Sequence, residues 1–117
     1  MKLTAMSAVL GFLGVALGAF GAHGLEGHLT TEGLAWWETA TFYLLVHASL
    51  AAAISLHGER FRVPVMLWLG GAAVFAGTLY LMALGAPRWF GAITPLGGTA
   101  LLAGWLWLAA LALRSKP

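Results

Sequence analysis

Six polar side chains of this 117-residue chain have the chemistry to bind a ligand. His47 is the most informative, because it lies inside a long apolar stretch and imidazole changes charge near neutral pH. Tyr43 precedes it by four residues, which places both side chains on one face of a helix. Tyr80 is expected at a depth similar to that of Tyr43. The candidate ligand-binding residues are His23, Glu38, Tyr43, His47, Tyr80 and Thr94.

Two interpretations of this polar set are open. In the first, the candidates line a small site that opens toward one side of a membrane. In the second, they form a hydrogen-bond network that ties helix ends together, with Glu38 paired to Arg88 and His47 a neutral imidazole bonded to a neighbouring helix. Glu38 and His47 are nine residues apart, so they lie on opposite faces of their helix and cannot pair there.

Catalytic and metal chemistry find little support in the residue types. The chain has no cysteine, and no other histidine or carboxylate is expected at the depth of His47, although a metal site usually needs three or four ligands. We find no nucleophile with a base and an acid, no phosphate-binding glycine loop and no basic cluster for nucleic acid. We therefore expect a protein that is not an enzyme, with no metal, no cofactor and no nucleic-acid partner.

The elements that position these side chains are membrane helices. Hydrophobic residues make up 61% of the chain and charged residues only 9%, against about 25% charged residues in an ordinary soluble domain. Four apolar stretches each approach the roughly 20 residues that cross a bilayer as a helix. We expect an all-α, integral membrane four-helix bundle that forms one domain over residues 1–117, with helices at about 3–22, 36–56, 64–85 and 95–113.

Local signals refine these boundaries. Thr30 or Thr31 is suited to cap the second helix, and Thr94 is suited to cap the fourth, with Pro95 at its first position. Gly85, followed by proline two residues later, predicts the end of the third helix. The first stretch also resembles a secretory signal peptide, but its length favours a retained helix.

Basic residues predict the orientation of the chain. Arg88 is alone on one side, whereas the other side collects Lys2, Arg60, Arg62, Arg114 and Lys116. The positive-inside rule then places both termini in the cytoplasm. Tryptophans are expected near the two membrane boundaries, with Trp36, Trp37 and Trp89 on the outer side and Trp68 and Trp107 on the inner side.

Small residues predict how the helices pack. Without a hydrophobic gain between helices in lipid, glycine at three- or four-residue spacing favours close backbone approach. The candidate packing residues are Gly11, Gly14, Gly18, Gly77, Gly97 and Gly104. These faces pack inside the chain or form a homo-oligomer, and membrane lipids are the other expected partners.

Several ordered motifs together resemble a known family. They are Gly18-Ala-Phe-Gly-Ala-His-Gly-Leu25, Trp37-Glu-Thr-Ala40, Tyr43, His47-Ala48, Gly77-Thr-Leu-Tyr80, Ile93-Thr-Pro-Leu-Gly-Gly98 and Gly104-Trp105. The set is similar to the family named DUF four-two-three, which includes bacterial inner-membrane proteins of the YgdD type. The resemblance implies a four-span, multi-pass protein of the bacterial inner (plasma) membrane without an established activity. It draws attention to the candidate residues but assigns them no reaction.

Two functions follow as hypotheses. The first is a non-enzymatic membrane protein that packs as a compact bundle and acts through partners or lipid. The alternative is a protein that binds or transports a small apolar ligand, such as a quinone or a lipid, at a site formed by tyrosine and histidine.

Overall fold

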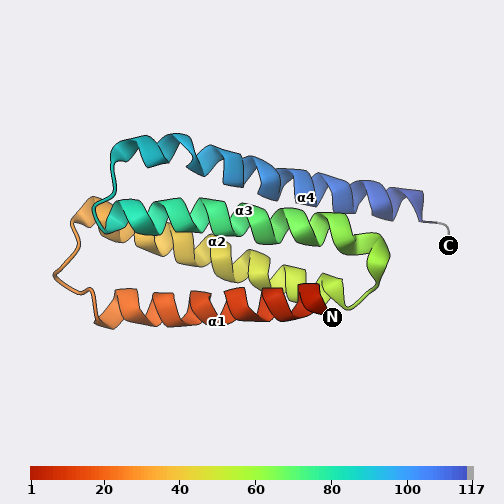
Figure 1. The fold of residues 1–117 in the computed structure, drawn as a ribbon, viewed down its shortest axis with the longest axis horizontal. Coiled ribbons are helices and arrows are strands. Elements are labelled where there is room, and N and C mark those ends of the chain that lie inside the picture. The colour runs from red at the N-terminus through yellow and green to blue at the C-terminus, as the bar shows by residue number, and fades with distance from the viewer. Residues whose placement is uncertain (116–117) are drawn as a thin grey trace.

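Four long α-helices form the chain in the computed structural model, which describes residues 1–115 (Figure 1). They are α1 (Lys2–His23), α2 (Thr31–Ser55), α3 (Arg62–Ala83) and α4 (Thr94–Arg114). Two short 3-10 helices, η1 (Glu59–Phe61) and η2 (Arg88–Ala92), precede α3 and α4. The prediction of an all-α, four-helix membrane protein is therefore confirmed.

Helix α2 begins five residues earlier than the apolar pattern suggested. The side chain of Thr30, one of the two expected caps, accepts a hydrogen bond of 2.9 Å from the backbone nitrogen of Gly33. A capped helix can start before its apolar part, because the cap satisfies a backbone N–H in a polar environment. The prediction for Thr94 was wrong, since Thr94 is the first residue of α4 and Ile93 precedes it without a side-chain cap.

The helices are arranged as an open row rather than around a closed core. Helices α2 and α3 pack against each other in the centre, with α1 against α2 and α4 against α3. Helices α1 and α4 lie on opposite sides of the central pair (Figure 1), and each has most of its surface exposed. The start of α1 and the end of α4 lie toward the same end of the long axis of the helices (Figure 1).

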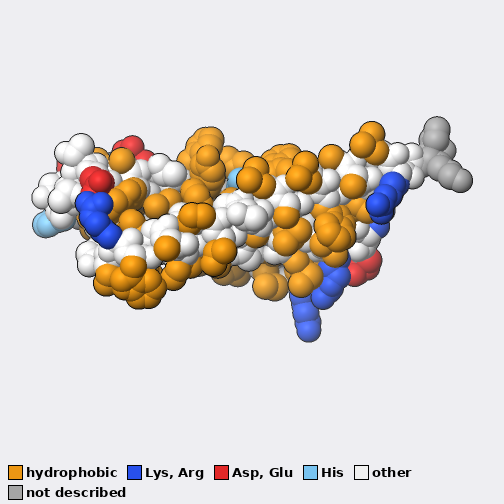
Figure 2. Space-filling model, turned by 90° about the horizontal axis from the view of Figure 1, so that it is seen from above, with side chains coloured by type: hydrophobic (Ala, Val, Ile, Leu, Met, Phe, Trp, Pro, Cys, Tyr) orange, Lys and Arg blue, Asp and Glu red, His pale blue; other side chains and the backbone are white. Residues whose placement is uncertain are grey.

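The two ends of the molecule differ in the segments and in the charged side chains that they carry. The terminal end carries Met1, the turn 56–61 and Ser115, and the loop end carries the connections 24–30 and 84–93. Figure 2 shows Lys and Arg side chains gathered at the terminal end, an apolar band along the molecule, and a smaller group of acidic and basic side chains at the loop end. This distribution is typical of helices that cross a bilayer, because charged groups are costly in its centre.

Three of the helical segments in the described part of the chain are long and apolar enough to cross a membrane, namely those that contain α1, α3 and α4. Helix α2 has 25 residues and is longer than each of the helices α1, α3 and α4, but it carries Glu32, Glu38 and His47. The helix that holds half of the polar candidates is thus also the least apolar of the four.

Two tryptophans that we expected at the membrane boundaries belong to the core. Trp68 is fully buried, and Trp37 is 3% exposed. Trp37 donates a hydrogen bond of 2.8 Å to the carbonyl oxygen of Leu17, which ties α2 to α1. An indole buried between helices supplies a large apolar surface and a single polar group to satisfy. Both indoles therefore pack between helices rather than toward lipid.

Some of the predicted packing glycines lie at close contacts between helices, whereas others have open space beside them. A methyl group on Gly97 would lie 2.5 Å from the backbone nitrogen of Phe75, and one on Gly14 would lie 2.7 Å from a Leu45 methyl. A methyl group on Gly18 would lie 2.9 Å from Thr41 of α2, and one on Gly104 would lie 2.5 Å from Trp68 of α3. Gly11 has only an ordinary neighbour at 4.0 Å, and Gly77 has none within 4 Å. Gly77 therefore does not pack helices within one chain.

Helix α3 uses a different small-residue face from the expected one. Its buried small residues are Gly71, Ala72 and Ala76. The stripe formed by Gly70, Ala73 and Gly77 points away from the other three helices, with Gly70 and Ala73 exposed and Gly77 half-buried.

Candidate functional site

His47 is buried on the side of α2 that faces α4, with 7% of its surface exposed. Its Nε2 accepts a hydrogen bond of 3.1 Å from the indole Nε1 of Trp105, and its Nδ1 lies 2.8 Å from the carbonyl oxygen of Tyr43. Because an indole N–H can only donate, Nε2 is the unprotonated nitrogen and Nδ1 donates to the carbonyl. His47 is thus a neutral imidazole whose two nitrogens are both engaged.

A groove of about 500 Å³ runs beside His47 between α2 and α4. Phe75 of α3 lines it, with the Tyr43 ring packed against it at a centroid distance of 4.7 Å. The ring of Trp105 forms part of the opposite wall and is 44% exposed. The hydroxyl of Tyr43 makes no hydrogen bond with any residue of the described range 1–115. We call this groove, defined by Tyr43, His47, Phe75 and Trp105, the aromatic groove.

Tyr80 belongs to a second cluster on the other side of α2. Its hydroxyl lies 2.6 Å from the hydroxyl of Thr41, and its ring meets the edge of Trp37 at a centroid distance of 4.4 Å. Trp37 in turn bonds to α1 through Leu17. The cluster therefore joins α1, α2 and α3, and it does not share a site with Tyr43.

Thr94 takes part in a third contact, between α3 and the start of α4. Its hydroxyl lies 2.6 Å from the hydroxyl of Thr78, which also donates to the carbonyl oxygen of Val74 over 2.8 Å. Because the Thr78 proton is used by Val74, Thr94 donates its proton to Thr78, and the carbonyl oxygen of Phe90 lies 3.3 Å from the Thr94 hydroxyl. These bonds satisfy hydroxyl groups on a buried helix contact, as expected where no water is available.

Glu38 and His23 lie apart from these clusters, both exposed near the loop end. The expected pair of Glu38 with Arg88 was wrong, because Arg88 pairs with Glu32 at 2.6 Å. Glu32 lies in the first turn of α2, where a carboxylate is favoured by the helix dipole, and the guanidinium also lies 5.6 Å from the Trp36 ring. Glu38 instead borders a shallow apolar pocket between α1 and α2.

The structure thus separates the six candidates into groups with different surroundings. Only Tyr43 and His47 border one cavity, the aromatic groove. Within residues 1–115, no group of three or more histidine, aspartate or glutamate side chains is close enough to hold a metal ion. The aromatic groove offers aromatic surfaces, one free hydroxyl and a satisfied imidazole, which suits an apolar molecule with a single polar group.

Phe75 and Trp105 complete the groove but were not among the candidates. Trp105 had a signal in the sequence, since it lies in the middle of an apolar helix where its N–H needs a partner. A histidine in the middle of another helix is a suitable acceptor. Phe75 had no comparable signal, because an apolar residue in an apolar helix is equally suited to face lipid.

Comparison with known proteins identifies relatives along most of the chain. A family model described as "Protein of unknown function (DUF423)" matches residues 17–98. The UPF0382 membrane protein of Haemophilus influenzae is 42% identical over 99 residues, which are 81% of this chain and 80% of that protein. A UPF0382 membrane protein of Staphylococcus saprophyticus is 40% identical over 96 residues, 78% of this chain and 79% of the relative. One of Schizosaccharomyces pombe is 35% identical over 106 residues, 82% of this chain and 88% of the relative. No solved structure matches the chain.

Proposed function

We propose that this chain, which belongs to the DUF423 family of membrane proteins, is a multi-pass protein of the bacterial inner (plasma) membrane that acts without catalysis. In this proposal it acts through the lipid-facing sides of its helices, on lipids and on further copies of itself. The names of all three relatives above and the apolar band of Figure 2 support a membrane location.

The length of α2 supports a fourth membrane crossing beside the three apolar segments, and thus the multi-pass topology of this proposal. The 25 residues of α2 extend over about 37 Å, which exceeds the roughly 30 Å of a hydrocarbon core. The excess places Glu32 and Glu38 near the membrane surface at the loop end. With four crossings, both termini lie on one side, and the basic residues at the terminal end favour the cytoplasm.

The observation that carries the proposal is the open row of helices with an unpartnered small-residue stripe. Gly70, Ala73 and Gly77 lie on the outer side of α3, and a methyl group added at either glycine would meet no other part of the described chain within 4 Å. Small residues at this spacing are typical of surfaces where membrane helices approach closely. We therefore expect a second copy of the chain to pack against this stripe.

Pairing of five polar side chains in the apolar part of the molecule supports a role without catalysis. His47, Thr41, Tyr80, Thr78 and Thr94 each bond to another group of the same chain. A catalytic group needs a free donor or acceptor for its substrate. The pairs instead satisfy polar groups between helices, which in membranes contributes about 0.6 kcal/mol on average.

Crosslinking of single cysteines tests the proposal, since the chain has no cysteine of its own. We expect Ala73→Cys to form a disulfide-linked dimer in nanodiscs, whereas Ala16→Cys, on the exposed side of α1, forms none. Native mass spectrometry should give a mass of two or more 12.3 kDa chains. A monomeric mass together with no crosslink at Ala73→Cys would contradict the proposal.

The aromatic groove favours a second candidate function, the binding or transport of a small apolar ligand such as a quinone or a lipid. Its volume of about 500 Å³ and the free Tyr43 hydroxyl are the supporting observations. Trp105→Ala should remove one wall of the groove and abolish retention of an added quinone in native mass spectrometry. Trp107→Ala, an exposed tryptophan on the same helix outside the groove, is the matched control. Equal retention by both variants would exclude this site.

A further inference from the structure

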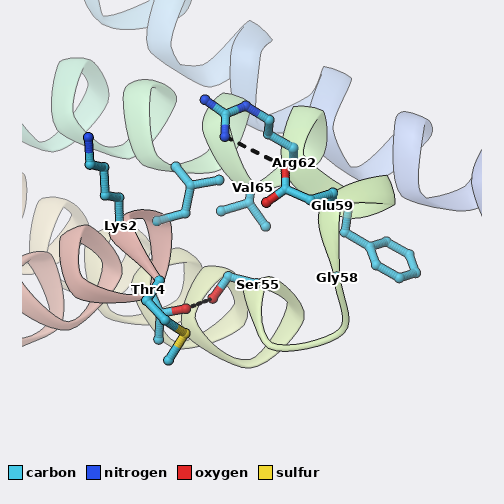
Figure 3. A pocket seen from close by; sticks show the side chains of 10 residues that line it. Lys2, Thr4, Ser55, Gly58, Glu59, Arg62 and Val65 are labelled. Carbon is cyan, nitrogen blue, oxygen red and sulfur yellow. Dashed lines mark hydrogen bonds and ion pairs between the residues drawn. The ribbon is translucent and has the colours of Figure 1, made fainter.

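A second cavity, at the terminal end, is polar where the aromatic groove is apolar (Figure 3). It has a volume of about 200 Å³ and lies between the first turn of α1, the end of α2 and the turn that leads into α3. Lys2 and Arg62 extend along one side of it, and Thr4 and Ser55 close the opposite side (Figure 3). We call it the terminal pocket.

The two cations of the terminal pocket have unused donor groups. Lys2 makes no hydrogen bond with any described residue, and the nearest carboxylate oxygen to Arg62 belongs to Glu59, at 3.7 Å. That distance is longer than a hydrogen bond, and both side chains are more than half exposed, so the pair contributes little. Arg60, by contrast, is engaged, because it donates to the Leu111 carbonyl oxygen over 3.1 Å and to the Ser115 hydroxyl over 2.6 Å.

The hydroxyl groups in the pocket form its wall rather than its recognition element. Ser55 donates to the carbonyl oxygen of Ala52 over 2.8 Å, so the 2.7 Å contact with Thr4 is a hydrogen bond from Thr4 to Ser55. Both hydroxyl protons are therefore committed inside the protein. Lys2 and Arg62 remain as the groups that can bind an anion.

The position of the pocket identifies the kind of anion. Val65, fully buried, and Leu3 line its inner part, so the pocket lies where the apolar band meets the charged terminal end. Lipid phosphates lie at this boundary of a bilayer, and anionic lipids attract basic residues there. Among the described charged side chains at this end, Lys2, Arg60, Arg62 and Arg114 oppose the single carboxylate of Glu59.

We propose that the terminal pocket binds the phosphate of an anionic phospholipid, with Arg62 and Lys2 as the donors and the acyl chains along the apolar surface of α1 and α3. Arg62 suits a phosphate because its planar guanidinium donates two parallel hydrogen bonds. The negative charge of Glu59 repels the lipid phosphate and lowers the affinity of the pocket for the lipid. This inference requires a membrane location but neither self-association nor the orientation of the chain.

Binding of phosphatidylglycerol to the purified full chain tests the inference. In mild detergent at physiological salt, we expect this lipid to bind more tightly than phosphatidylcholine, as measured by native mass spectrometry and by the rise in melting temperature. Each basic residue near an anionic lipid contributes about fivefold in affinity, so the double variant Lys2→Gln/Arg62→Gln should bind about 25-fold more weakly. Glu59→Gln should bind up to about fivefold more tightly, a gain that a misfolded variant could not show.

Arg114→Gln is the matched control, because it removes the same charge at the same end but from outside the pocket. We expect it to retain affinity within about twofold, since salt screens exposed charges beyond about 8 Å. Equal binding of the two lipids by the unaltered chain would overturn the inference, as would an equal loss in Arg114→Gln and Arg62→Gln. Full competition by millimolar inorganic phosphate would also overturn it, by assigning the pocket to a soluble anion.

Discussion

At the scale of single residues, the bond between His47 and Trp105 is the contact that joins α2 to α4 across the aromatic groove. It couples two side chains that are 58 positions apart in the sequence. The imidazole accepts only while it is neutral, because a protonated ring has no acceptor. Loss of either side chain therefore removes the whole bond, so the effects of the two substitutions on the free energy of unfolding should not be additive.

Replacing His47 with phenylalanine should show this coupling. We expect His47→Phe to lower the free energy of unfolding by about 1 kcal/mol, since the Trp105 N–H loses its acceptor in a region without water. Trp105→Phe should have a similar effect, and the double variant should cost about as much as either single change. Reversible unfolding in mixed micelles measures the three values. His57→Phe, in an exposed turn, is the control, and strictly additive effects would refute the coupling.

The two tyrosines of the chain offer a second comparison between matched residues. Tyr80→Phe removes a hydroxyl that lies 2.6 Å from Thr41, and we expect it to destabilise the protein by about 0.5 to 1 kcal/mol. Tyr43→Phe removes a hydroxyl without a described partner and should leave stability unchanged within about 0.3 kcal/mol. The same unfolding assay compares them. A larger loss in Tyr43→Phe would mean that its hydroxyl has a partner in the membrane.

These residues also show how far the sequence predicts a site. The four-residue spacing placed Tyr43 and His47 on one face, and the structure brings both to the aromatic groove. Tyr80 was expected at a similar depth, but depth along a helix says nothing about the direction in which a side chain points. The structure places Tyr43 and Tyr80 on two different sides of α2.

At the scale of helices, the crossing of α3 and α4 depends on a close backbone approach at Gly97. We expect Gly97→Ala to destabilise the protein by about 1 to 3 kcal/mol, because its methyl group would meet the backbone of Phe75, which cannot move alone. Gly14→Ala should cost less, since its neighbour is the flexible end of Leu45. Thermal unfolding in detergent should give this order, and an equal or reversed order would contradict it.

The variant Gly77→Ala distinguishes the contribution of Gly77 to helix packing within one chain from its contribution to contacts between two chains. The position is open, so we expect unfolding of the monomer to change by less than about 0.5 kcal/mol. Self-association through the stripe of Gly70, Ala73 and Gly77 should nevertheless weaken, because a methyl group keeps two helices apart. Analytical ultracentrifugation in detergent measures this second effect. Unchanged association would remove the stripe from the proposed interface.

Helix positions were predictable from apolar length, but helix neighbours were not. The four apolar stretches correspond to α1–α4, with most boundaries within two residues. Small residues occur on two sides of α3, at Gly70, Ala73 and Gly77 and at Gly71, Ala72 and Ala76. Spacing alone cannot decide between these sides, because each satisfies the same requirement for close approach. Gly77, the packing residue predicted in this helix, lies on the outer of the two sides.

At the scale of the whole molecule, the separation of charges predicts which regions are accessible from each side of the membrane. We expect a membrane-impermeant maleimide to label His28→Cys and Pro87→Cys in intact spheroplasts of a bacterial host. His57→Cys and Arg114→Cys should react only after the cells are made permeable, since basic ends remain in the cytoplasm. The cysteine-free chain is the control for background labelling.

Different patterns of labelling would contradict different parts of this topology. Reaction of His57→Cys in intact spheroplasts would reverse the orientation. Different accessibility of His28→Cys and Pro87→Cys would mean that α2 and α3 do not both cross the membrane. The second outcome tests the least apolar helix, α2, whose crossing is supported by its length.

The open row also determines how the protein can be assembled during its synthesis. Each helix packs chiefly against its neighbours in the chain, so a contact surface becomes available as soon as the next segment leaves the translocon. In a closed ring of helices, by contrast, the first helix would lack one of its neighbours until the last helix had been inserted. A nascent polypeptide of this kind can settle into lipid one segment at a time, in the order in which the ribosome makes it.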